Sequence, residues 1–249
     1  MQIRCSAITH VGRRRNNEDS HSVRPDLGLA VVADGMGGYE GGEVASRLVV
    51  ESLVELFDRT CRDADSTLPL APRPTREPLA DLVGVGLEHA HRVVQSRREG
   101  VLARMGSTAA VVAWSGARLV VGHVGDSRVY RLRDGVLQGL TVDHSVAEEA
   151  RRAGMEGEAV DMAGFRHMLT RAVGMPGELG ADVAMGWLRP GDVLMLCSDG
   201  VWEPLTEPTI AGELMRTCPE EAAQALVAAA YEAGSTDNLT AVVVQVRGD

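Results

Sequence analysis

The sequence predicts an α+β fold in which helices cover layered, antiparallel sheets. Short apolar strands follow one another with turn dipeptides between them, which is typical of antiparallel hairpins and not of alternating strand–helix units. The predicted helices occur in two separated pairs, an arrangement that favours a layered sandwich. The 249 residues are 45% hydrophobic and 24% charged, which are ordinary globular proportions. Because this length can bury a substantial core, we expect one domain over residues 1–249.

Two strands and a helix are predicted near the N-terminus. Residues 3–9 and 27–33 form the strands, and the second is a continuous apolar run that belongs in the middle of a sheet. A glycine-rich turn follows at 34–42. Residues 43–59 have apolar side chains at i, i+4 and i+7, which is the spacing of a helix with one buried face.

A proline-rich segment separates this helix from the next one. Residues 63–78 contain four prolines among polar residues and can support neither a helix nor a strand ladder. We therefore expect a surface loop there. A second helix is expected from about 79 to 98, with Leu82, Leu87 and Val94 on its buried face.

The middle of the chain is rich in predicted β-structure. Its four strands are separated by Ser-Gly, Gly-Asp and Asp-Gly turns and comprise residues 107–114, 117–124, 127–133 and 136–141. Residues 145–167 are charged and partly helical without a clear apolar face, which suits a mobile flap.

Strands and one further helix complete the predicted domain. Strands resume at 181–188 and 192–197. Pro219 begins a helix that extends to about residue 233, with two glutamates near its positive end. A last strand at 239–246 closes the domain.

The charged residues exclude several classes of function. All 25 basic residues are arginines, so the chain lacks the amine of Schiff-base enzymes and the phosphate-binding lysine of P-loop proteins. A net charge of -10 and a pI near 5.2 argue against nucleic-acid binding and against binding to anionic membranes. No apolar run approaches the roughly 18 to 20 residues that cross a bilayer, and the N-terminus lacks a signal-peptide pattern. We therefore expect a cytoplasmic protein.

Acidic residues recur at strand ends and in tight glycine turns. They lie in five short segments, at residues 17–19, 34–38, 125–128, 198–200 and 236–238. Two such charges about 4 Å apart repel by about 4 kcal/mol at an effective dielectric constant of about 20. Arginine, protons or metal ions could compensate this repulsion. Oxygen ligands select hard cations such as Mg²⁺ or Mn²⁺, and such ions assist the attack of water on a phosphoryl group.

Eight motifs carry a resemblance to a known family. In chain order they are Arg14-x-x-Asn17-Glu18-Asp19, Asp34-Gly35-Met36-Gly37-Gly38, Gly106-Ser107-Thr108, Gly125-Asp126-Ser127-Arg128-Val129-Tyr130, Leu140-Thr141-Val142-Asp143-His144-Ser145, Leu169-Thr170-Arg171-Ala172-Val173-Gly174, Ser198-Asp199-Gly200 and Asp237-Asn238-Leu239-Thr240. Their order resembles that of metal-dependent protein serine/threonine phosphatases of type 2C, in the compact bacterial form of the family. They span almost the whole chain, which makes a chance match very unlikely.

The resemblance implies a fold and a metal centre. The fold would be a four-layer αββα sandwich, in which two central antiparallel sheets are flanked by helices. A centre with two Mn²⁺ or Mg²⁺ ions would lie at one edge. The catalytic aspartates Asp34, Asp199 and Asp237 would hold the first ion, and Asp34 would bridge to a second ion that also binds the Gly35 carbonyl.

The resemblance also implies roles for four further residues. Glu18 and Asp19 would hold metal-bound waters, and Asp126 would bind a possible third ion. Arg14 would bind the substrate phosphate, because its planar guanidinium can donate hydrogen bonds to two phosphate oxygens at once. Arg14 is preferred over its arginine neighbours because of its five-residue distance from Asp19.

The implied reaction is the hydrolysis of phosphoserine and phosphothreonine on proteins by direct attack of a metal-bridged water. The implied partners are phosphorylated proteins, among them a Hanks-type serine/threonine kinase and its substrates, and the enzyme is expected to be a monomer. Two alternatives remain open. One is a metal-dependent phosphohydrolase for small phosphoesters, and the other is a phosphatase-like binding module without activity.

The chain departs from the family pattern at two places: the segment between Gly12 and Asn17 is one residue shorter than in the usual bacterial pattern, and position 36 is a methionine. Eukaryotic members have a histidine where this chain has Met36, so the usual group that protonates the leaving alcohol is missing. His144 is a possible replacement, although a turn histidine with a satisfied hydrogen bond is the favoured interpretation.

Overall fold

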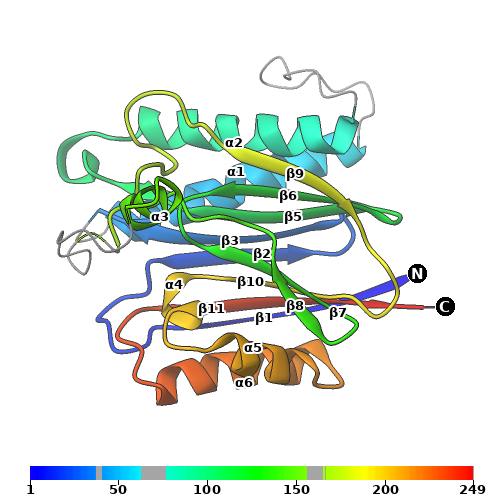
Figure 1. Cartoon of the computed structure of the whole chain (residues 1–249). Coiled ribbons are helices and arrows are strands. Elements are labelled where there is room, and N and C mark those ends of the chain that lie inside the picture. Colours follow the sequence, from blue (N-terminus) through cyan, green and yellow to red (C-terminus); the bar gives the residue numbers. More distant parts are fainter. Residues whose placement is uncertain (38–40, 63–76, 156–164, 166, 249) are drawn as a thin grey trace.

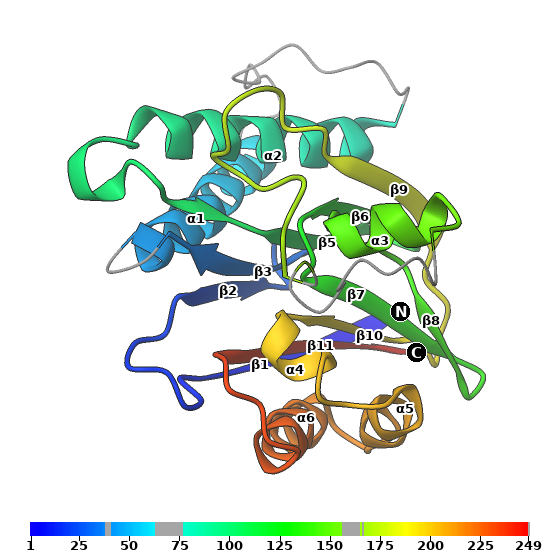
Figure 2. The ribbon, with the colours of Figure 1, turned by 60° about the vertical axis from the view of Figure 1, so that its left-hand side comes forward.

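The computed structural model describes residues 1–37, 41–62, 77–155, 165 and 167–248. Two antiparallel sheets are stacked face to face, and a pair of helices covers the outer face of each (Figures 1 and 2). The predicted four-layer αββα sandwich is therefore confirmed. None of the helices in these described ranges is both long enough and apolar enough to span a membrane.

The six-stranded sheet carries the N-terminal part of the site. Its order is β2-β3-β5-β6-β9, and β4 pairs with β3. The strands are β2 (Asp19–Arg24), β3 (Leu29–Met36), β4 (Gly106–Ser107), β5 (Ala109–Ser115), β6 (Arg118–Val124) and β9 (Asp182–Trp187). Helices α1 (Gly41–Arg62) and α2 (Pro78–Ser96) pack on its outer face (Figure 1).

The five-stranded sheet carries the C-terminal part of the site. Its order is β1-β11-β10-β7-β8. The strands are β1 (Gln2–His10), β7 (Arg128–Arg133), β8 (Val136–Gly139), β10 (Val193–Cys197) and β11 (Leu239–Arg247). Helices α5 (Glu207–Leu214) and α6 (Pro219–Glu232) cover its outer face. Three short helices lie elsewhere among the described residues, η1 (Gly100–Leu102), α3 (Val146–Arg152) and α4 (Asp199–Trp202).

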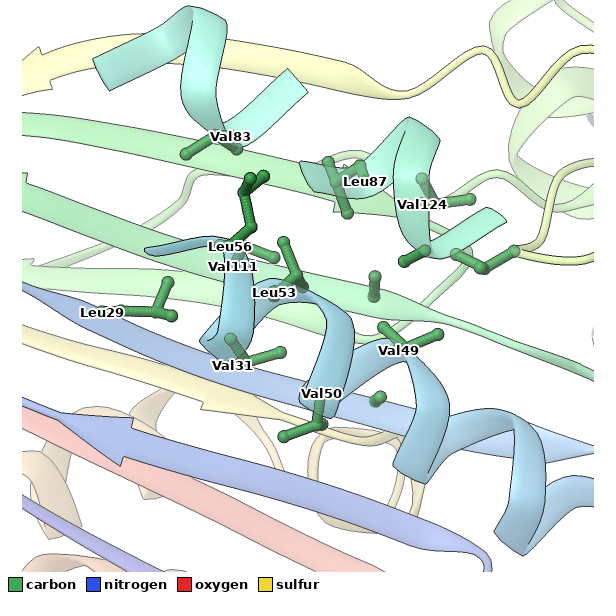
Figure 3. Packing of buried hydrophobic residues seen from close by; sticks show 14 of the residues in the cluster. Leu29, Val31, Val49, Val50, Leu53, Leu56, Val83, Leu87, Val111 and Val124 are labelled. Carbon is green, nitrogen blue, oxygen red and sulfur yellow. The ribbon is translucent and has the colours of Figure 1, made fainter. Parts of the chain in front are cut away.

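The first five residues of β3, at positions 29–33, are apolar and buried. Successive side chains of a strand point to opposite faces, so both faces of β3 are buried. Leu29 and Val31 pack with the helices, whereas Ala30 and Val32 pack between the two sheets. Figure 3 shows the helix side of this arrangement, where Leu53 of α1 lies among the side chains of the sheet and of α2.

The structure corrects several predicted element boundaries. Pro78, which we assigned to the proline-rich loop, is the first residue of α2, where a missing N–H has no consequence. The rest of that loop, at 63–76, lies outside the described residues. Within the predicted flap, α3 confirms the helical part, and 156–164 lie outside the described residues.

The sequence prediction missed the short helices η1 and α4 and two longer elements, β2 and α5. Strand β2 has the polar sequence DSHSVR and lies at the edge of its sheet, where no face is fully buried. Helix α5 has eight residues, two of them buried, so its apolar periodicity is weak. In both cases tertiary contacts decide the structure and the local pattern does not.

Candidate functional site

The acidic segments predicted from the sequence converge at one end of the sandwich. Asp19 and Asp34 are direct register partners of β2 and β3. Asp199 is the first residue of α4, immediately after β10, and Asp237 lies just before β11. Figure 1 shows α4 at the end of the sheets that lies away from the two chain termini. The site therefore draws its carboxylates from both sheets.

A cavity of about 530 Å³ opens among these residues. Its lining consists of Arg14, Arg15, Asn16, Glu18, Asp34, Gly35, Met36, Gly37, Thr108, Asp126, His167, Leu169, Asp199, Asp237 and Asn238. Seven of the eight predicted site residues are therefore brought to one cavity. The eighth, Asp19, is not among the lining residues.

Asp19 connects the two sheets beside the cavity. The hydroxyl groups of Ser198 and Thr240 donate hydrogen bonds of 2.7 and 2.6 Å to its Oδ2. Its Oδ1 is buried without a hydrogen-bond partner among the described residues. Asp19 thus has one oxygen fixed by the opposite sheet and one oxygen left unsatisfied.

Burial raises the pKa values of the clustered carboxyl groups. It is the main cause of a pKa of about 7 for Asp19, about 8 for Asp126 and about 6 for Asp199. It also raises the pKa of Asp34 well above its ordinary value. The charges of neighbouring aspartates add to each shift. Ionised together, these groups need a compensating positive charge.

The donor set fits divalent cations. Oδ1 of Asp19 and Oδ1 of Asp199 are both buried without a partner, and a buried unpaired carboxylate oxygen is costly. Carboxylates and a backbone carbonyl are the ligands of Mg²⁺ and Mn²⁺. A side chain at Gly35 would overlap the Gly42 carbonyl oxygen, so glycine is needed where β3 passes this close to the start of α1.

Arg14 is the arginine that reaches the acidic cluster. Its Nη2 lies 2.6 Å from Oδ2 of Asp237, and 56% of its side chain is exposed. Arg15 also lines the cavity, whereas the Arg13 guanidinium lies 5.6 Å from the centre of the Tyr231 ring. The structure therefore brings Arg14, and not Arg13, into contact with a predicted site carboxylate.

Asn238 fixes the N-terminal loop of the site, a role that we did not assign from the sequence. Its side-chain amide donates to the carbonyl groups of Val11 and Asn16, at 2.9 and 3.0 Å. Its side-chain oxygen accepts a 2.8 Å hydrogen bond from the Glu18 N–H. The Asp-Asn pair at 237–238 was visible in the sequence, but the distant backbone groups it contacts were not.

Trp202 is a second residue to which we assigned no role from the sequence, and it contacts the backbone of Asp126. The indole N–H of Trp202 donates a 2.9 Å hydrogen bond to the Asp126 carbonyl oxygen. The Arg128 guanidinium lies 3.3 Å from the centre of the Trp202 ring and forms two hydrogen bonds of 2.8 and 2.7 Å to Asp143. Short helix α4, which begins with Asp199, is thereby tied to the loop that carries Asp126.

His144 belongs to a separate buried group. Its Nδ1 accepts a 3.2 Å hydrogen bond from the Gly125 N–H, and its Nε2 lies 3.2 Å from Oδ2 of Asp182. It is not among the residues that line the cavity. The interpretation of His144 as a turn histidine with satisfied hydrogen bonds is therefore confirmed.

His144 also lies near His123 and Asp182, and ligand atoms of these three residues lie within 4.8 Å of one another. Such spacing would suit a metal ion. However, a ring that accepts at Nδ1 keeps its proton on Nε2, which then donates to Asp182. In this arrangement His144 has no free nitrogen for a metal.

Comparison with known proteins identifies the family. The family model described as Protein phosphatase 2C matches residues 8–232. The serine/threonine protein phosphatase PstP of Mycobacterium tuberculosis is 34% identical over 238 residues, which cover 94% of this chain and 43% of PstP. The serine/threonine phosphatase stp of Listeria monocytogenes is 32% identical over 240 residues, which cover 93% of this chain and 91% of that protein.

A solved structure agrees with the sequence matches. The catalytic domain of PstP in complex with two manganese ions has a TM-score of 0.81 and 33% identity, and the match covers 99% of both chains. This chain spans about 43% of the length of full PstP and most of the length of stp. On the family match and these identities, the chain belongs to the protein phosphatase 2C family.

Proposed function

We propose that this chain is a metal-dependent phosphatase that removes phosphate from phosphoserine and phosphothreonine of proteins. The observation that carries the proposal is the single cavity that joins Arg14 to the carboxylates of both sheets, beside two buried carboxylate oxygens that lack a partner. The names of PstP and stp support the substrate class. The manganese ions of the PstP catalytic domain support the cofactor.

The proposed cofactor is a pair of Mn²⁺ or Mg²⁺ ions. Asp34, Asp199 and Asp237 would hold the first ion, and Asp34 with the Gly35 carbonyl would hold the second. When bound, such a pair acidifies water and neutralises phosphate oxygens. The convergence of these groups on one cavity supports the assignment.

The remaining acidic residues would act around this pair. Glu18 and Asp19 would accept hydrogen bonds from waters near the ions, and the buried, unpartnered Oδ1 of Asp19 supports this role. Asp126 would help hold a third ion, and its position on the cavity wall together with Asp199 supports that role.

Arg14 would orient the substrate. Its guanidinium can donate two parallel hydrogen bonds to a phosphate group, and its exposed side chain can reach an incoming substrate. Thr108, which also lines the cavity, has its hydroxyl engaged by the Asp34 N–H and by Ser127. Direct attack of water is proposed over a covalent phosphoenzyme, because no serine or cysteine is among the lining residues and the lining aspartates are assigned to the ions.

The wider biological setting is proposed from the substrate class. The partners would be phosphorylated proteins, including a Hanks-type serine/threonine kinase and its substrates, with the chain acting as a single-domain monomer. A phosphohydrolase for small phosphoesters is the alternative enzyme. An inactive binding module is disfavoured because all the principal metal-binding aspartates are present.

Activity measurements test the proposal. We expect Mn²⁺-dependent hydrolysis of para-nitrophenyl phosphate and of a phosphothreonine peptide, abolished by EDTA. Asp237→Asn should lower turnover by at least about 100-fold, because it removes a carboxylate ligand. The matched control is Asp134→Asn, in the exposed turn between β7 and β8, where asparagine tolerates the φ of 51°. Absence of turnover with every metal would contradict the proposal and favour the binding module.

A further inference from the structure

Loss of a phosphate from serine or threonine leaves an alkoxide, which is a poor leaving group unless it receives a proton. A positioned general acid typically contributes about 10²- to 10⁴-fold to such a step. At the position where related eukaryotic enzymes have a histidine, this chain has Met36, which has no proton to give. The proposed phosphatase therefore needs a proton donor from another part of the cavity.

The lining residues leave one candidate. The carboxyl groups proposed to hold cations must be ionised, so they cannot act as acids; they are those of Asp34, Asp126, Asp199 and Asp237. Glu18 is proposed to accept hydrogen bonds from waters near the ions, which is a role of the carboxylate form. Arginine guanidinium groups hold their protons too strongly. His167 is the one histidine among the cavity-lining residues, and imidazolium is the side-chain acid suited to neutral pH.

The backbone that follows His167 is anchored near the site. The Met168 N–H donates a 3.1 Å hydrogen bond to the Phe165 carbonyl, and the Val146 N–H donates a 2.9 Å hydrogen bond to the Met168 carbonyl. Leu169, which also lines the cavity, forms a bridge to Ser145. The two residues that follow His167 are thus fixed to the start of α3.

A carboxylate lies beside the imidazole. Nε2 of His167 lies 3.7 Å from Oε1 of Glu203. The Glu203 N–H donates a 2.9 Å hydrogen bond to the carbonyl of Asp199, so this carboxylate is tied to a residue of the acidic cluster. The His167 side chain is 63% exposed, so it can regain a proton from water. Because Nε2 lies nearest Glu203, Nδ1 is the ring nitrogen left to give a proton to a substrate.

We propose that His167 is the general acid for the leaving serine or threonine oxygen, with Glu203 as its positioning residue. As water attacks phosphorus, the bond from phosphorus to the leaving oxygen breaks and its electron pair stays on that oxygen. The imidazolium gives one proton to the oxygen, and a neutral alcohol leaves. The neutral imidazole then takes a proton from solvent. This inference rests on the proposed phosphatase function.

Leaving-group dependence tests the proposal. Para-nitrophenolate leaves as a stable anion and needs no proton. Phenolate is more basic and depends more on a proton donor, and a threonine alkoxide depends on it most. We expect His167→Gln to lower kcat/KM at least about 100-fold for a phosphothreonine peptide and less for phenyl phosphate. For para-nitrophenyl phosphate the change should be below about 3-fold. His89→Gln, on α2 and away from the cavity, is the matched control and should leave all three rates unchanged.

The pH profile of kcat and the activity of a Glu203 variant give two independent readouts. In the wild type, kcat for the peptide should fall as rising pH deprotonates the acid, and His167→Gln should remove this limb of the profile. Glu203→Gln should give a smaller loss, again confined to the poorer leaving groups. Equal losses on all substrates, or no loss on the peptide, would overturn the proposal. Failure of the wild type to hydrolyse any phosphopeptide would instead count against the protein-phosphatase function, since the aryl phosphates still test His167.

Discussion

At the scale of single residues, two carboxylate oxygens define the candidate site. Oδ1 of Asp19 and Oδ1 of Asp199 are buried and have no partner among the described residues. A buried charge without a partner costs several kcal/mol, and a divalent cation offsets this cost through oxygen coordination. The arrangement that is unfavourable for the ionised protein alone is therefore favourable for cation binding.

The raised pKa values predict how stability depends on pH without metal. Asp19 and Asp126 have pKa values of about 7 and about 8, above their ordinary value of 3.8. Between the ordinary pKa of 3.8 and these raised values, the folded protein binds more protons than the unfolded chain. Its free energy of unfolding therefore falls as pH rises. The loss is at most about 1.4 kcal/mol per group and pH unit. We expect a loss of roughly 1–3 kcal/mol from pH 7 to 8.5, measured by urea denaturation in EDTA.

This pH window separates the cluster from the groups whose pKa values are lowered, whereas the buried thiols Cys5 and Cys197 begin to contribute only as the pH approaches 9. The lowered pKa values of His123 and Asp192 act below about pH 6.5 and below about pH 4, respectively. Asp126→Asn should reduce the slope, and saturating Mn²⁺ should remove most of it. Metal-free stability that stays level or rises from pH 7 to 8.5 would contradict this assignment.

At the scale of elements, the close approach of α4 to the start of β11 sets the distance between Asp199 and Asp237. A side chain at Gly200 would overlap the carbonyl oxygen of Asn238. We expect Gly200→Ala to lower the free energy of unfolding by roughly 2–4 kcal/mol, because backbone must move, and to weaken Mn²⁺ binding. Urea denaturation and calorimetric titration with Mn²⁺ measure the two effects.

Gly212 in helix α5 is the matched control for this prediction. A side chain there would meet nothing within 4 Å, so Gly212→Ala should stabilise the protein by about 0.5–1 kcal/mol through helix propensity. Its Mn²⁺ affinity should not change. Equal stabilities for the two variants would show that α4 and β11 tolerate a wider separation than the structure has.

The elements also show which parts of the fold local sequence could predict. Helix α1 was predicted from its apolar periodicity and strand β3 from its continuous apolar run, and both patterns match surfaces that are buried in the structure. Strand β2 could not be predicted in this way, because it is polar and depends on its pairing with β3. Aspartates after apolar strands were visible as site candidates, whereas His167 and Trp202 act through neighbours that are distant in sequence.

At the scale of the whole molecule, stacking of the two sheets forms the site. Asp19 and Asp34 lie on the six-stranded sheet, whereas Asp199 and Asp237 lie at strand ends of the five-stranded sheet. The hydroxyl groups of Ser198 and Thr240 reach across to Asp19. Composition and turn patterns predicted the fold class, but the distances between carboxylates from different sheets required the structure.

The most direct test of the account is phosphate release from a phosphothreonine peptide by metal-stripped protein titrated with Mn²⁺. We expect no turnover without metal, activity that rises as the ions bind, and no recovery in Asp237→Asn at the same Mn²⁺ concentrations. A calorimetric titration of the same samples should show binding by the wild type that is weakened in the variant. Turnover that persists in EDTA, or an Asp237→Asn variant as active as the wild type, would contradict a phosphatase centre built on these carboxylates.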